Sequence, residues 1–345
     1  MKKTLALLIA GLLVMCGLSA CAFGKKKPNL EILPTMQSKS TATNQVWVGT
    51  FQLIWNDLVN EIIKNPVEFV GTKSIMADEL NKQAFTTDEL SDSSYYKKFD
   101  KTSPKLKKEI EKGIMEKFNE KSDILDQLDW TEDVDKYTLY AMLKKDFEFT
   151  QAFSNLAPAK FHGSKGKVKY FGLEEKAPAD LRKMVHVLFY NNDDDFAVSI
   201  STKGDDIVYL YRTNSKGTLE DLYWDMQRKF KTSISNPRFT EKDEIKIPNF
   251  DFKSERNFDE LCNKQIKDTN LKISQALESI EFKMDNKGVK LKSEAAMTIM
   301  KMSLMPDEPT PRHFYFDDSF VLFLQEKDRQ PYFAMRVSDV KSLQK

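Results

Sequence analysis

The sequence has few of the residues from which enzyme sites are usually built. Its 345 residues include only three cysteines and three histidines, His162, His186 and His313. No HExxH or CxxC spacing that would hold a metal occurs among them. The 12 glycines form neither a phosphate-binding loop nor a nucleophile elbow. We therefore expect that the protein is not an enzyme and has no metal site and no cofactor.

The chain also lacks an excess of charge of either sign. Lys and Arg number 53 and Asp and Glu 52, a formal net charge of +1. A nucleic-acid-binding protein normally shows a clear basic excess, so we expect no nucleic-acid partner. The acidic run Asp193-Asp194-Asp195 has neither the glycine nor the distal glutamate of a calcium loop. We interpret it as a solvated hairpin turn.

The N-terminus has the features of a secretion signal over residues 1–20. Two lysines precede the apolar run Leu5–Leu18, which is shorter than a membrane-spanning helix. The run ends in Leu18-Ser19-Ala20-Cys21, which resembles the lipobox of bacterial lipoproteins. That resemblance implies cleavage before Cys21, lipidation of its thiol, and attachment to a membrane of the bacterial cell envelope, outside the cytoplasm. Ordinary secretion with a free Cys21 is the alternative, and Cys16 is a weaker site.

Residues 21–43 follow as the lipidated cysteine and a polar segment with two prolines, which we interpret as a flexible tether. The folded domain is then expected to span residues 44–345. With Cys21 lipidated, Cys262 has no partner for an internal disulfide. Its surroundings, Phe258–Cys262, are typical of one turn of an amphipathic helix, and we expect a buried free thiol there.

The body of the chain predicts helices first and strands later. Apolar residues recur at helical spacing from Phe51, and residues 75–126 are charged and helical, with a helix start at Thr102-Ser103-Pro104. From Tyr137 onward, strand-like runs alternate with turn signals, interrupted by one helix at 217–230. This order, without a βαβ rhythm, predicts an α+β fold.

One segment changes character along its length. After Gly288 the chain alternates as a strand does, with Val289, Leu291, Ser293 and Ala295 on one face and Lys290, Lys292 and Glu294 on the other. A run rich in methionine and proline follows, and a strongly apolar strand begins at Phe320. A fixed edge strand followed by a solvent loop is one interpretation of this segment.

Six further segments resemble parts of serpins, in the same order along the chain. The most specific are the tail strands and the hinge before the alternating segment. The segments are Asn44–Asn56, Tyr140–Phe153, Ile247–Phe250, Ile280–Gly288, Phe314–Leu324 and Tyr332–Val337. The resemblance covers residues 44–345. It implies a monomer with N-terminal helices, a large central mixed or antiparallel sheet, smaller sheets and an exposed reactive-type loop.

The resemblance also implies a function for residues 288–312. In serpins a protease cleaves the reactive loop, which then inserts into the central sheet. Gly288 matches the hinge glycine, flanked by Val289 and by Asn286 in place of the family's glutamate. The family's spacing puts the scissile bond at Met302-Ser303, with Lys301-Met302 as the near alternative. The implied partner is an extracellular or periplasmic serine or cysteine protease.

Several residues depart from the pattern of inhibitory serpins. These have small residues after the hinge, whereas this chain has Val289, Lys290 and Leu291. A glycine of the closing strand is replaced by Met335. Two functions therefore remain open: protease inhibition, or a non-inhibitory surface lipoprotein that binds a partner or ligand. An envelope lipoprotein unrelated to serpins is a third alternative.

Overall fold

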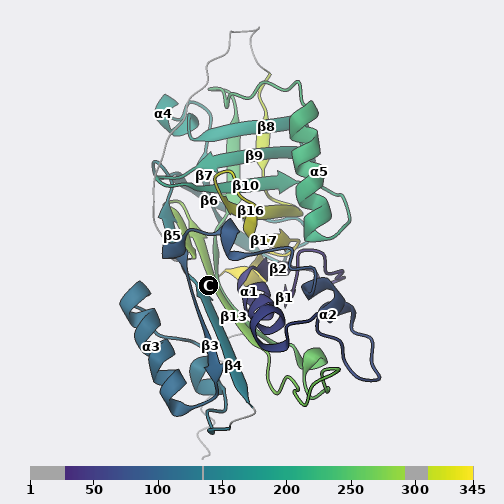
Figure 1. Cartoon of the computed structure of the whole chain (residues 1–345). Coiled ribbons are helices and arrows are strands. Elements are labelled where there is room, and N and C mark those ends of the chain that lie inside the picture. The colour runs from purple at the N-terminus through teal and green to yellow at the C-terminus, as the bar shows by residue number, and fades with distance from the viewer. Residues whose placement is uncertain (1–27, 134–135, 292–309, 345) are drawn as a thin grey trace, which may run out of the picture.

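The computed structural model describes residues 28–133, 136–291 and 310–344 (Figure 1). In this part of the chain the strands form one seven-stranded sheet, two four-stranded sheets and one two-stranded pair. No helix in these ranges is long and apolar enough to cross a membrane. The predicted signal peptide, residues 1–20, lies outside the described residues.

The seven-stranded sheet contains strands from both the N-terminal and the C-terminal parts of the folded chain. Its central strands are almost wholly buried, as their continuous apolar runs predict. Helix α5 (Leu219–Thr232) contacts several of its strands and begins with a capping box between Thr218 and Asp221. In spatial order the strands are β1 (Glu31–Ile32), β2 (Gln45–Val48), β17 (Pro331–Val337), β16 (Phe320–Glu326), β10 (Asp206–Arg212), β9 (Asp195–Ser201) and β8 (Val185–Asn192).

The N-terminal tether prediction is wrong from Glu31 onward. Residues Glu31–Ile32 form β1, which pairs in parallel with β2. Ile32 and Leu33 are only 1% and 2% exposed. These two side chains are part of the core, and Leu30 and Met36 pack against it, so apolar burial fixes the segment. The folded body therefore begins before residue 44.

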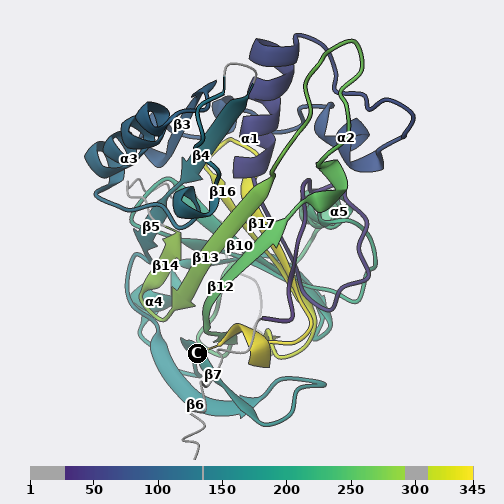
Figure 2. The ribbon, with the colours of Figure 1, turned by 90° about the horizontal axis from the view of Figure 1, so that it is seen from below.

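The two four-stranded sheets are connected to each other by the chain. One has the order β15 (His313–Tyr315), β11 (Glu244–Pro248), β7 (Lys167–Leu173) and β6 (Ser154–Lys160). The other has the order β12 (Phe250–Asn257), β13 (Leu277–Asp285), β14 (Gly288–Leu291) and β5 (Lys145–Glu148). The chain passes between the two sheets from β5 to β6 and from β11 to β12. Figure 2 shows β12, β13 and β14 side by side, with β5 beyond β14.

The prediction of a helical region over residues 75–126 is only partly correct. Helices α2 (Ile75–Leu80) and α3 (Pro104–Phe118) form, and α3 begins at Ser103 as its cap, as predicted. Between them, however, β3 (Tyr95–Lys101) pairs antiparallel with β4 (Tyr137–Leu143). This pairing joins segments that are distant in sequence, and Ile110 and Ile114 on the apolar face of α3 pack against it. Tertiary contacts therefore override the local charge pattern that suggested a helix.

The remaining elements are short. Helix α1 (Thr50–Asp57) continues into a π-helical turn, and Phe258–Cys262 contains a single 3₁₀ turn where a helical turn was predicted. The short elements are η1 (Leu58–Ile63), η2 (Thr87–Glu89), η3 (Asp92–Ser94), η4 (Leu125–Gln127), α4 (Ala179–Arg182), η5 (Asp259–Leu261) and η6 (Lys341–Leu343). The α+β prediction is confirmed.

Candidate functional site: a seated strand above an open slot

Strand β14 is the start of the predicted reactive loop, and it lies inside a sheet. It pairs antiparallel with β13 on one side and with β5 on the other. Val289 is fully buried and Leu291 is 8% exposed. The Lys290 side chain between them is 67% exposed. The alternation predicted for this segment is therefore observed over residues 289–291.

The predicted hinge residues lie where β13 turns into β14: Asn286 is in the turn, and Gly288 and Val289 are the first residues of β14. A Cβ atom on Gly288 would lie 2.2 Å from the carbonyl oxygen of Phe147 and 2.7 Å from the Cα of Glu148. The neighbouring backbone therefore leaves no room for a side chain at this position. Asn286 donates its amide Nδ2–H to the carbonyl of Phe153 at 3.0 Å. Whether these residues act as a hinge remains a prediction.

The far end of the predicted loop is held by Arg312. Its Nη2 lies 2.8 Å from Oδ2 of Asp243, a residue with no exposed surface. Its Nη1 donates to the carbonyl of Asn236 at 2.9 Å. Both ends of the loop are thus fixed, one by β14 and one by Arg312. The scissile candidates Lys301, Met302 and Ser303, and the lipidation candidate Cys21, lie outside the described residues.

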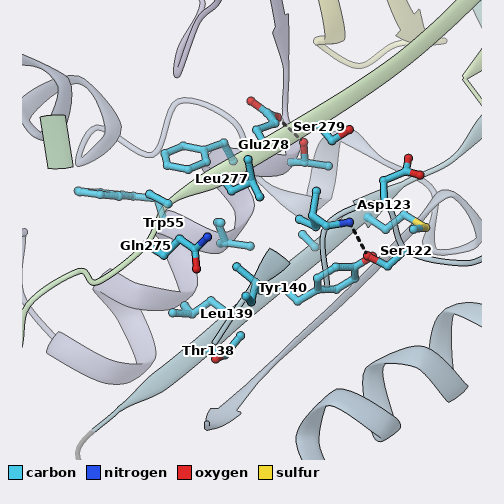
Figure 3. A pocket seen from close by; sticks show the side chains of 18 of the residues that line it. Trp55, Ser122, Asp123, Thr138, Leu139, Tyr140, Gln275, Leu277, Glu278 and Ser279 are labelled. Carbon is cyan, nitrogen blue, oxygen red and sulfur yellow. Dashed lines mark hydrogen bonds between the residues drawn. The ribbon is translucent and has the colours of Figure 1, made fainter. Parts of the chain in front are cut away.

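Beyond Leu291 the sheet opens into a cavity, which we call the slot. It has a volume of about 1050 Å³ and lies between β4 and β13 (Figure 3). Within the described residues, 277–282 of β13 pair with β12 only, and β4 pairs with β3 only. The edges facing the slot therefore carry backbone groups without a ladder partner. Phe51, Ile54 and Trp55 of α1 also line the slot.

A buried glutamate, Glu278, lies at the edge of the slot on β13. The Thr50 hydroxyl donates to its Oε1 at 2.6 Å, and its Oε2 has no hydrogen-bond partner in the described structure. Burial raises the pKa of Glu278 to about 8, although hydrogen bonds from Thr50 and from the backbone N–H of Phe51 and the charge of Arg256 act in the opposite direction. Sequence reasoning missed this residue. The signal was a glutamate on the face that otherwise carries Ile280, Phe282 and Met284.

A second buried charge cluster lies behind β14. Lys145 is the register partner of Leu291 and is 2% exposed. Its Nζ lies 2.8 Å from Oδ1 of Asp206 and 2.6 Å from Oε1 of Glu326. Burial raises the pKa of Asp206. These ion pairs fasten β5 to the seven-stranded sheet directly behind the seated strand, and no sequence motif indicated them.

The other residues considered from the sequence have structural surroundings. Asp194 pairs with Arg212 at 3.0 Å and Asp195 with Lys229 at 2.8 Å, so two of the three aspartates bind cationic side chains. Cys262 is partly buried, and burial raises the pKa of its thiol, which opposes nucleophilic reactivity. Within the ranges that the structure describes, no three His, Cys, Asp or Glu residues gather as a metal site.

Comparisons with known proteins give matches among solved structures. No family model matches the chain, and no curated protein sequence matches it. Among solved structures, it is similar to Serpin48, a highly specific serpin of the insect Tenebrio molitor, with 14% identity over 84% of this chain and 96% of that chain and a TM-score of 0.46. It is also similar to human thyroxine-binding globulin complexed with thyroxine, with 10% identity over 85% and 96% and a TM-score of 0.46.

Proposed function

We propose that the protein is a monomeric, membrane-anchored serpin-like inhibitor of a serine or cysteine protease, and not an enzyme. The observation that carries this proposal is the position of β14. The first residues after Gly288 already occupy the sheet between β13 and β5, and the slot continues along the same line. A cleaved loop would find two strand edges with open backbone groups to pair with.

The ladder register supports insertion of the residues that follow. Lys290 lies opposite Lys283 of β13 and Asp146 of β5. Continued at the same register, the ladder would bring Ser293 opposite Ile280, and Ala295 opposite Glu278. Side chains alternate along a strand, so both small residues would face the core as Val289 and Leu291 do. The lysines and glutamate between them would face outward.

The proposed cleavage site sets the class of target. A cut at Met302-Ser303 suits chymotrypsin-like or elastase-like proteases, and a cut at Lys301-Met302 suits trypsin-like ones. We further propose that lipidation of Cys21 anchors the protein in the bacterial cell envelope, where an extracellular or periplasmic protease would meet it.

The test is a covalent complex that survives denaturation. The protein is incubated with elastase, chymotrypsin and trypsin, and products are separated by denaturing electrophoresis and mapped by mass spectrometry. The Ser293→Arg variant should be cut without forming a complex, because an inward arginine blocks insertion. The matched Lys292→Arg variant should behave as the parent. Cleavage of the parent without any complex would contradict the inhibitor proposal.

A second candidate is a non-inhibitory binding protein, and the size of the slot favours it. A cavity of about 1050 Å³ lined in part by Trp55 and Ile54 could accommodate a small ligand. The bulky Val289 and Leu291 after the hinge also favour loss of inhibition. Deleting residues 295–305 separates the two candidates. In an inhibitor the deletion should abolish protease inhibition, whereas in a binding protein it should leave binding of a ligand in the slot intact.

A further inference from the structure

The contact between Glu278 and the start of helix α1 links one edge of the slot to the layer behind it. Glu278 lies on β13, and its partner Thr50 is the first residue of α1. Figure 3 shows Glu278 beside the slot, with Leu277 and Ser279 as its neighbours on the strand. If this contact broke, β13 would lose a polar link to α1. At this point along β13, the described strands include only β12 as a ladder partner.

We propose that Glu278 is a pH-operated latch: its neutral form stays buried between β13 and α1, and its ionisation favours a state in which β13 and α1 separate and water from the slot reaches the carboxylate. The latch does not depend on loop insertion, because all of its groups lie in described strands and helices. It would apply equally to an inhibitor and to a binding protein.

The surroundings of Glu278 explain why its charge is poorly supported. Helix α1 faces it with the uncharged Thr50 and the backbone of Phe51. Arg256 of β12 is its direct partner in the ladder. However, the Arg256 guanidinium bonds to Glu31 and Glu260, at 3.1 and 2.5 Å. Its charge is therefore shared with two other carboxylates.

Of the charged groups in the described ranges, Arg256 is the one that acts on the pKa of Glu278. Lys136 and Lys144, just outside the two ends of β4, also line the slot. The facing strand, β4, has the sequence YTLYAML and contributes no carboxylate or amine. Its Tyr140 hydroxyl bonds to Ser122. On β13 itself, Glu281 and Lys283 point to the opposite, exposed face. Ionised Glu278 would thus leave Oε2 buried without a partner, and hydration from the slot would relieve this.

Linkage fixes the expected pH dependence. In the closed latch, where Glu278 is buried against α1, burial raises its pKa to about 8. A hydrated glutamate titrates at about 4.3. The closed form therefore binds the proton more tightly, and rising pH favours the open form between these two values. The opening constant should increase about tenfold per pH unit up to about pH 8 and then level off.

Hydrogen–deuterium exchange of the full chain from pH 5.5 to 9.5, corrected for intrinsic exchange, tests the latch. The peptide covering residues 49–57, whose Phe51 amide donates to Glu278, should show the rise and the plateau. Peptides from β16 and β17, which report on opening of the distant sheet, should not. The Glu278→Gln variant should abolish the pH dependence, and Glu281→Gln, an exposed change on the same strand, should preserve it.

Two results would overturn the proposal. One is the same slope in Glu278→Gln as in the parent, and the other is an equal slope in the β16 and β17 peptides. If Glu278→Gln does not fold, the parent protein still decides. A rise in the α1 peptide that levels near pH 8 and is absent from β16 and β17 supports the latch, and a flat profile rejects it.

Discussion

Val289 of β14 lies between Met284 of β13 and Phe147 of β5, paired with both. The strand that begins the predicted reactive loop is therefore already part of a sheet. The Val289 side chain has no exposed surface, so burial as well as pairing stabilises β14 in the sheet. Beyond Leu291, the slot continues in the direction of β14, and no described strand lies there between β4 and β13.

Gly288 is the residue on which this seating depends most directly. Gly288→Ala places a methyl group where the Phe147 carbonyl oxygen and the Glu148 backbone already lie. We expect the free energy of unfolding to fall by about 1–3 kcal/mol, as for other overpacked sites. Denaturant unfolding measures this. Lys290→Ala, on the exposed face of the same strand, should change stability by less than about 0.5 kcal/mol. A Gly288→Ala protein as stable as the parent would contradict the described packing.

Lys145 offers a test of the buried charge cluster. Lys145→Met keeps a long unbranched side chain but removes the cation that Asp206 and Glu326 share, and Glu326 retains only Arg329 at 3.2 Å. Breaking such a pair typically costs about 3–5 kcal/mol. The loss should shrink between pH 7 and pH 5, because the buried Asp206, left without a cation, can then take up a proton. Lys203→Met removes an exposed ion pair with Glu148 and should cost less than about 1 kcal/mol. Equal losses at both pH values would show that charge is not the cause.

The packing of the N-terminal segment predicts a stability cost for its removal. A chain that starts at residue 39 loses the buried side chains of Ile32 and Leu33 and the pairing of β1 with β2. Each side chain is worth about 1.5–3 kcal/mol, so the melting temperature should fall clearly relative to a chain that starts at residue 28. If both chains melt together, the segment is a tether after all.

The sequence predicted those elements whose signal is local. The buried runs of β16 and β17, the proline and serine at the start of α3, and the alternation after Gly288 each belong to a single segment. Their periodicity and capping do not depend on distant partners.

The missed features depend on contacts between distant segments. β3 is a strand because β4, about 40 residues later, pairs with it. Lys145 is buried because Asp206 and Glu326 meet it from another sheet. Glu278 differs, because its place on an apolar face was visible, but its partner Thr50 is distant in sequence. Pairing of this kind cannot be inferred from periodicity alone.

The proposed lipid anchor has a direct test. Cys21→Ser removes the thiol to which acyl chains would be attached, so the protein expressed in a bacterium should move from the detergent-rich to the aqueous phase on phase separation. Cys262→Ser should leave its partition unchanged, because that thiol is partly buried in the folded body. A parent protein found only in the aqueous phase would contradict lipidation.

The most direct test of the account is a melting curve before and after limited proteolysis of the chain lacking residues 1–21. We predict that a single cut between residues 292 and 309 raises the melting temperature sharply. The freed strand would then fill the slot and pair with the edges of β4 and β13. A cut that leaves the melting temperature unchanged, or lowers it, would contradict insertion and favour the binding protein.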